Sequence, residues 1–171
     1  MMHRLILCAV AVASLTASAA EPTRVVKNVT VFHQPGMFGG WPANNGVWVW
    51  GNEIVVGFIQ GYFKNNERGH AIDGQKPELL RFARSTDGGL TWKIEAPSFL
   101  NADGKEDEGT ECPGGLDFTA PNSAVALRMV SSSRGFSRFY YSKDRAKTWQ
   151  GPYKLPAFDR KGIAARTDYI V

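Results

Sequence analysis

Short apolar runs rich in β-branched and aromatic residues recur along this chain from Val25 onward, separated by Gly, Asn, Asp and Pro. No stretch sustains the 3.6-residue period of an amphipathic helix, so the pattern predicts an all-β fold. The pair Gly51-Asn52 is expected to form a two-residue hairpin turn, because both residues tolerate a positive φ. The expected strands are Val25 to Phe32, Val47 to Trp50, Glu53 to Gln60, Glu78 to Arg84, Trp92 to Ala96, Ser123 to Val130, Arg138 to Ser142 and Trp149 to Leu155.

The first 20 residues have the pattern of a secretory signal peptide. His3 and Arg4 precede the apolar run Leu5 to Val12, and small residues follow up to Ala20. We therefore expect residues 1–20 to be removed on export, which leaves residues 21–171 as one domain, secreted or periplasmic. A membrane anchor is the alternative, but a spanning helix needs about 20 continuous apolar residues and polar residues interrupt this run.

Composition and charge narrow the functional classes. The chain is 43% hydrophobic and 21% charged, which is typical of a folded soluble protein and argues against disorder. The net charge of +4 comes from basic residues that are scattered among acids, so we expect no nucleic-acid partner. Cys112 is the only cysteine after the leader and has no internal disulfide partner. We expect no cofactor.

An internal repeat is the most informative feature. Ser85 to Trp92 reads STDGGLTW and Ser142 to Trp149 reads SKDRAKTW. An Asp carboxylate can accept hydrogen bonds from its own turn, Ser and Thr hydroxyls tie the flanks, and the Trp packs into the sheet. We therefore expect structural roles for Ser85, Asp87, Gly89, Thr91, Trp92, Ser142, Asp144, Thr148 and Trp149.

The two copies differ at the tip of the turn. Arg145-Ala146 stands where the first copy has Gly88-Gly89. A residue with a Cβ costs about 1 kcal/mol at a position that needs a positive φ. The second turn is therefore expected to be weaker or slightly altered.

This octapeptide resembles the Asp box, or bacterial neuraminidase repeat, of the sialidase superfamily. The chain is similar to exported bacterial exo-sialidase-like proteins, in which stretches such as GTECPGG, SRFYYS and ARTDY recur. The resemblance implies a sialidase-like β-propeller, six-bladed in the complete protein, with the Asp box between the third and fourth strands of each blade. Residues 21–171 would supply two to three blades, so we expect the chain to be an N-terminal fragment.

The resemblance also implies catalytic and substrate-binding residues. Sialidases use three arginines to hold a carboxylate, an Asp acid/base, and a Tyr nucleophile with a supporting Glu. Within the loop from Asn66 onward, Arg68 matches an arginine and Asp73 the acid/base, and His70 between them could bind substrate or shuttle a proton. Arg166 and Asp168, in ARTDY, are expected substrate ligands.

Two features depart from this pattern or lie outside it. The arginine of the first blade is absent, since the segment reads Gly39-Gly40-Trp41-Pro42-Ala43. The Tyr and its Glu would come from later blades. Trp41, Trp48 and Trp50 could stack on sugar rings, although alternating Trp in a strand is typical of a core.

A second polar loop, Glu106 to Asp117, carries five carboxylates in twelve residues. Such a run is typically solvated, and Glu111, beside a Pro-Gly-Gly turn, is the catalytic candidate within it. Calcium is an alternative ligand, but the spacing does not follow an EF-hand loop, so no metal site is predicted.

The sequence therefore predicts an exported sialidase-like glycoside hydrolase that acts on glycan ends. The alternative is a propeller that binds carbohydrate or protein without catalysis, because fold alone does not decide function.

Overall fold

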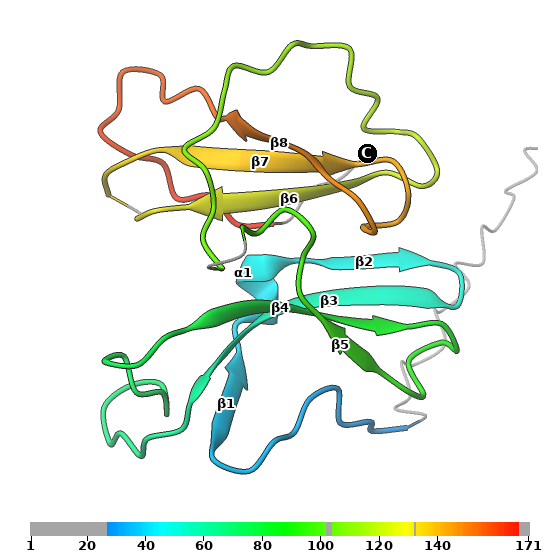
Figure 1. The fold of residues 1–171 in the computed structure, drawn as a ribbon, viewed down its shortest axis with the longest axis vertical. Helices are drawn as coiled ribbons and strands as arrows, with labels where there is room; N and C mark the ends of the chain where they lie inside the picture. Colours follow the sequence, from blue (N-terminus) through cyan, green and yellow to red (C-terminus); the bar gives the residue numbers. More distant parts are fainter. Residues whose placement is uncertain (1–26, 102–103, 132, 168–171) are drawn as a thin grey trace, which may run out of the picture.

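The computed structural model describes residues 27–101, 104–131 and 133–167 and shows two antiparallel β-sheets stacked face to face (Figure 1). The all-β expectation is confirmed, since the one helix among these residues, α1 (Pro42–Asn45), is a single turn. None of the described helices is long and apolar enough to cross a membrane. The expected signal peptide and Asp168 lie outside the described residues. The strands are β1 (Met37–Gly40), β2 (Val47–Trp50), β3 (Glu53–Tyr62), β4 (Leu79–Ser85), β5 (Lys93–Glu95), β6 (Ala124–Met129), β7 (Ser137–Ser142) and β8 (Gln150–Lys154).

Sheet 1 is built around the long strand β3. The first half of β3 pairs with β2 and its second half with β1, while its other edge pairs with β4, which in turn pairs with β5. The predicted hairpin is confirmed: Trp50 lies opposite Glu53, and Gly51 adopts φ 62. Sheet 2 has the simple order β6-β7-β8.

The first predicted strand is wrong over its described part. Residues 27–32 form no strand, and β1, which the apolar pattern does not predict, lies at the edge of sheet 1 instead. Glycine is a poor strand former, so a segment that ends in Gly39 and Gly40 is not predicted to be a strand. The fold needs them: a Cβ on Gly39 would lie 2.6 Å from the Phe32 ring, and one on Gly40 would lie 2.4 Å from the Phe38 ring.

The interface between the sheets is the main core. Sheet 1 contributes Trp48, Val55 and Phe82, and sheet 2 contributes small residues and Tyr140. The small residues let the large aromatic rings of sheet 1 pack closely. The Trp48 Nε1–H also donates to the carbonyl of Val125, 3.3 Å away, so a hydrogen bond crosses this interface. Residues 111–120 arch over the other face of sheet 2 (Figure 1), where Leu116 packs on the second core cluster.

The first octapeptide folds into a hydrogen-bonded turn between β4 and β5. Ser85 Oγ donates to Asp87 Oδ1 at 2.8 Å and accepts from the Gly89 N–H at 2.8 Å. The Asp87 carboxylate also accepts from the Leu90 and Thr91 N–H groups, each at 2.9 Å, and from Thr91 Oγ1 at 2.6 Å. These bonds satisfy backbone donors that would otherwise face solvent and so hold the turn in one shape.

The second octapeptide repeats this network between β7 and β8. Ser142 Oγ donates to Asp144 at 2.8 Å and accepts from the Ala146 N–H at 3.0 Å. Asp144 accepts from the N–H groups of Lys147 and Thr148 at 3.1 and 2.9 Å, and from Thr148 Oγ1 at 2.6 Å. Corresponding bonds of the two turns therefore have closely similar lengths.

The second turn keeps the backbone shape of the first but is slightly altered, as expected: Trp92 Nε1 donates to the Gly89 carbonyl at 2.9 Å, whereas the buried Trp149 Nε1 has no partner among the described residues. Arg145 (φ 59) and Ala146 (φ 61) adopt the left-handed conformation that Gly88 (φ 73) and Gly89 (φ 89) adopt in the first turn. Contacts to sheet 1 offset the strain, because Arg84 of β4 donates to the carbonyls of Arg145 and Ala146 at 2.9 and 3.1 Å. Ala146 is also buried in the core between the sheets.

Replacing Gly89 by Ala is expected to destabilise the protein by about 1 kcal/mol, because the residue must keep a positive φ. There is room for the methyl group, since the nearest atoms would lie 3.5 Å or more away. Gly74→Ala is the control: its Cβ would meet nothing within 4 Å and its φ is not positive. Urea denaturation of the three proteins measures the difference, and equal stability of the two variants would contradict the strain argument.

The Asp carboxylates of the two turns make the free energy of unfolding depend on pH. Burial raises the pKa of Asp144, but hydrogen bonds from Thr148, Ser142 and Lys147 outweigh it and hold this pKa below 3.8. A lowered pKa contributes stability above about pH 4, and this contribution is lost as the pH falls through the folded-state value. As the pH is lowered from 5 to 2.5, we expect the urea concentration at the unfolding midpoint to decrease. The decrease should be smaller in Asp144→Asn than in the wild type. Identical pH slopes for the two proteins would show that Asp144 has no such role.

Candidate functional site

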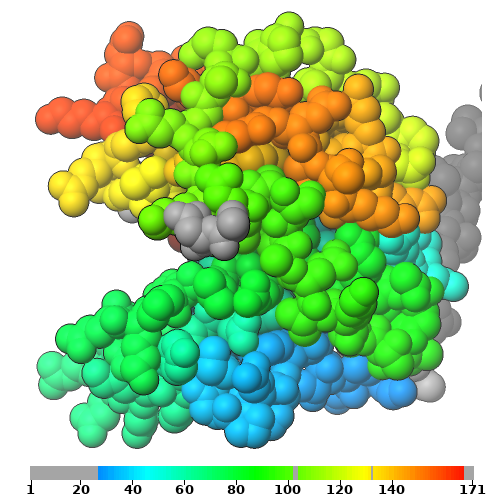
Figure 2. All heavy atoms as spheres, in the orientation of Figure 1, coloured from blue at the N-terminus to red at the C-terminus, as the bar shows by residue number. Residues whose placement is uncertain are grey.

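A cleft of about 270 Å³ lies where α1, the end of β3 and the end of β6 meet. We call it the inter-sheet cleft. Figure 2 shows the molecule hollowed between sheet 2, in yellow, and the segment that follows β3, in teal. The apolar lining includes Ile59, Leu127 and Met129, and the polar and aromatic lining residues are Trp41, Asn44, Asn45, Glu78 and Arg128. An aromatic ring among amides and charges is a composition typical of ligand sites.

Trp41 is held in an unusual conformation at the edge of this cleft. It precedes α1 with φ 58 and ψ 45, a left-handed geometry that costs a residue other than Gly about 1–2 kcal/mol. The side chain of Asn45 donates to the Trp41 carbonyl at 2.8 Å, and the Phe38 ring packs 5.1 Å from the indole. Strained residues that are fixed by their surroundings concentrate at functional sites.

Arg128 is the cationic group of the cleft. Its Nε donates to Glu106 Oε1 at 2.9 Å and its Nη1 donates to Asn45 Oδ1, whereas Nη2 has no partner within the described residues. The two N–H groups of Arg128 Nη2 therefore remain available to hydrogen-bond a ligand. A single charge in the otherwise apolar strand β6 is the sequence signal from which Arg128 could have been found.

Glu106 is the centre of a half-buried polar network. Besides Arg128 it accepts from the Tyr140 hydroxyl at 2.9 Å, and its Oε2 lies 3.9 Å from Arg138 Nε. Burial and the Glu106 charge raise the pKa of Tyr140 far above its usual value. Tyr140 therefore stays protonated and, being fully buried, is no nucleophile.

The loop 64–76 carries three of the residues named from the sequence. His70 packs edge-on against Trp41 at 5.0 Å, which joins this loop to the inter-sheet cleft. Asp73 Oδ1 accepts from the Gln75 N–H at 3.3 Å and lies 3.8 Å from Lys64 Nζ, with 16% of the Asp73 side chain exposed. The exposed Arg68 side chain forms no hydrogen bond or ion pair with the described residues.

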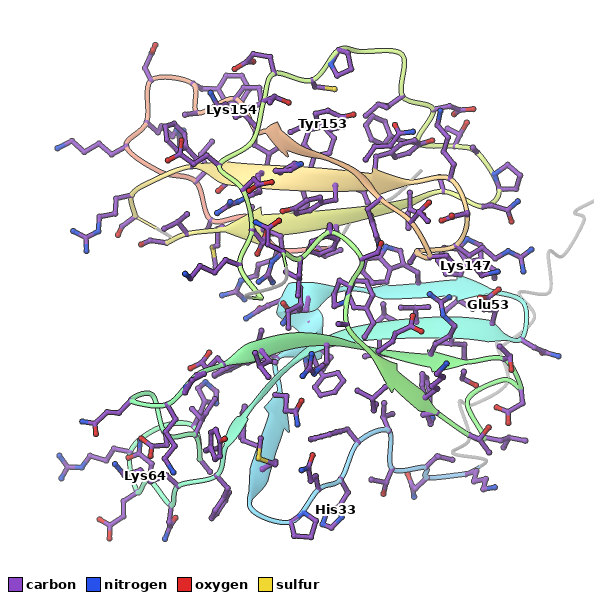
Figure 3. All side chains as sticks on the ribbon, viewed as in Figure 1. His33, Glu53, Lys64, Lys147, Tyr153 and Lys154 are labelled. Atoms are coloured by element: carbon purple, nitrogen blue, oxygen red, sulfur yellow. The ribbon has the colours of Figure 1, made fainter. Side chains whose placement is uncertain are left out.

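Glu111 does not share a site with Asp73. Its side chain is 88% exposed and lies 3.9 Å from Lys154. Figure 3 shows Lys154 and Lys64, the ion-pair partners of Glu111 and Asp73, at opposite ends of the molecule. The two carboxylates therefore cannot flank one glycosidic bond.

Arg166 is next in the chain to a residue of the inter-sheet cleft. It is exposed and follows Ala165, which lines the cleft. The neighbouring Thr167 holds this segment in place, because its hydroxyl accepts from the Leu127 N–H at 2.9 Å and donates to the Leu127 carbonyl at 3.1 Å. Arg166 itself does not line the cleft, whereas His70 reaches it through its contact with Trp41.

Across residues 27–101, 104–131 and 133–167, no three His, Cys, Asp or Glu side chains are grouped so that they could hold a metal ion. Comparisons of the chain with protein-family models, with curated proteins and with solved structures find no match.

Removing the Glu106 charge is expected to cost about 3 kcal/mol of stability, because Glu106→Gln leaves two half-buried arginines without their counter-charge. Glu111→Gln is the matched control and should change stability by less than about 0.5 kcal/mol, since its ion pair is exposed. Guanidinium denaturation measures both variants. Equal effects would contradict the network described for Glu106.

Proposed function

We propose that this chain is part of an exported sialidase-like glycoside hydrolase that binds the end of a glycan in the inter-sheet cleft. The observation that carries the proposal is the cleft itself, with the strained Trp41 beside Asn44, Asn45, Glu78 and Arg128. An indole face packs against the apolar face of a pyranose, and amides, carboxylates and guanidinium groups hydrogen-bond its hydroxyls.

The repeated turn supports the resemblance to sialidase-like propellers. Both octapeptides close the hairpin between the last two strands of their sheet, and both use the same hydrogen bonds from Ser, Asp and Thr. Successive sheets that pack face to face are the building plan of a propeller. In this proposal, the remaining blades and the Tyr nucleophile come from outside the described residues.

Asp73 is the proposed acid/base, and its loop reaches the cleft through the contact between His70 and Trp41. In the complete protein, replacing Asp73 by Asn should lower kcat on aryl glycosides by on the order of 100-fold and leave KM within about twofold. Asp159→Asn, an exposed carboxylate on another loop, is the matched control. The assay uses a panel of aryl glycosides that includes sialosides, and unchanged turnover by Asp73→Asn would remove Asp73 from the mechanism.

Glycan binding without hydrolysis is the second candidate. Two observations favour it: Glu111 lies far from Asp73, and the segment Gly39 to Ala43 has no arginine. On a glycan array this candidate predicts binding by the chain, with no sugar released from the same glycans in solution.

In both candidate functions, the glycan packs against the indole of Trp41. Trp41→Ala should weaken glycan binding about tenfold or more, while Trp41→Phe should retain part of the affinity. Phe158→Ala removes an exposed ring outside the cleft and should bind as the wild type does. Undiminished binding by Trp41→Ala would place the glycan elsewhere.

A further inference from the structure

Two loops at the strand ends of sheet 2 project together from one end of the molecule. We call them the tip loops: residues 133–136, between β6 and β7, and residues 156–161, after β8. Figure 2 shows them at the left edge, in yellow and orange-red. The Gly135 N–H donates to the Lys161 carbonyl at 3.0 Å and so joins the two loops. Further sheets that pack on the faces of sheet 1 or sheet 2, as in a propeller, would leave these loops exposed.

Phe158 lies at the tip of a strained turn in the second tip loop. The Arg160 N–H donates to the Ala157 carbonyl at 3.0 Å, and the two residues between them have positive φ values, 49 for Phe158 and 62 for Asp159. This combination is typical of a type I′ turn, which favours Asn, Asp and Gly at both central positions. A bulky side chain is strained in the left-handed conformation. The aromatic residue therefore destabilises the turn that carries it.

Packing within the described chain does not offset this strain. Phe158 is 78% exposed, the largest exposed fraction among the large hydrophobic residues that the structure describes. Strained residues concentrate at functional sites, where a role in function maintains them. The Phe158 ring is therefore available for a contact outside the chain.

Exposed apolar side chains continue at the hairpin between β6 and β7. Phe136 is 56% exposed, and Val130, on the opposite arm of this hairpin, is 65% exposed. The two residues are neighbours, because the Val130 N–H donates to the Phe136 carbonyl at 3.4 Å. Groups of exposed apolar side chains mark interaction sites, whereas single ones do not.

The tip loops are also positively charged. They contain three cationic residues, Arg134, Arg160 and Lys161, and one carboxylate, Asp159. All three cationic residues are exposed, and none of their side chains forms a hydrogen bond or ion pair with the part of the chain that the structure describes. Long cationic side chains that are free in this way can reach anionic groups while neighbouring rings leave the water.

We propose that the tip loops bind the surface of an anionic lipid membrane. The rings of Phe158 and Phe136 enter the boundary between headgroups and acyl chains, and the three cationic side chains contact lipid phosphates. Buried apolar area and attraction of Lys and Arg to anionic lipids are the two sources of such binding. The loops protrude, whereas sugar sites are concave. Lys is depleted in protein–protein interfaces, which favours a membrane over a protein partner. This inference does not depend on the proposed glycosidase activity.

The experiment measures flotation of the full chain with vesicles of phosphatidylglycerol and phosphatidylcholine in equal parts, and with vesicles of phosphatidylcholine alone. Binding to the anionic vesicles should be stronger and should weaken as salt is raised. Phe158→Asn should lower the vesicle partition coefficient about tenfold, although it relieves the strain and should raise the urea midpoint. Arg160→Gln and Lys161→Gln should each lower this coefficient about fivefold. The control Leu90→Ala, which removes another apolar side chain (52% exposed), should bind as the wild type does.

The apolar run of residues 5–12 can also enter lipid, so a second measurement locates the contact on the wild type. An isotopically labelled full chain is bound to bicelles of the same anionic composition that carry a spin-labelled lipid. The NMR signals of residues 133–136 and 156–161 should broaden, and those of residues 85–92 should not.

Equal partitioning of the wild type and Phe158→Asn, or equal partitioning of the wild type into the two kinds of vesicle, would overturn the proposal. Release from the vesicles by glycerol 3-phosphate, at the concentration of the lipid phosphate, would assign the cationic residues to a soluble phosphate instead. Broadening confined to residues outside the tip loops would place the membrane contact elsewhere. Circular dichroism establishes that Phe158→Asn is folded, and the spin-label measurement on the wild type decides the question if it is not.

Discussion

Arg84 holds the two sheets in register, and the rest of the structure depends on this contact. Its guanidinium group is only 11% exposed and lies 2.8 Å from Glu53 and 2.8 Å from Glu95. The same group donates to the carbonyls of Arg145 and Ala146 in the left-handed turn of sheet 2. Burial raises the pKa of Glu53, but hydrogen bonds from Arg145 and Arg84 outweigh it, so this carboxylate stays ionised and supports the arginine. Figure 3 shows Glu53 and Lys147 at this junction.

The inter-sheet cleft follows from the residues that β6 turns toward sheet 1. Ala124 and Ala126 are small and allow close packing against the aromatic rings of sheet 1. The next residue on that face is Arg128, whose charge cannot enter an apolar core unpaired. Arg128 donates hydrogen bonds to Glu106 and Asn45 instead, and the inter-sheet cleft lies beside Arg128. The change from packed core to polar cleft thus takes place within one strand.

The local pattern of the sequence predicted β2 to β8, the Gly51-Asn52 turn and the repeated octapeptide, because each depends on neighbours in the chain. It missed β1, whose extended form comes from pairing with β3 and not from strand propensity. It also treated the acidic run as one solvated loop and favoured Glu111, whereas Glu106 is the member that packs between the sheets. Which carboxylate of a run meets a distant arginine is decided by tertiary structure, and spacing carries no signal for it.

The claim that function resides in the inter-sheet cleft is tested most directly by solution NMR. An isotopically labelled full chain would be titrated with neutral and acidic monosaccharides. The account predicts saturable shifts of the Trp41 indole, the side-chain amides of Asn44 and Asn45 and the Arg128 guanidinium group. Saturable shifts confined to residues away from the cleft, or no shifts with any sugar, would contradict it.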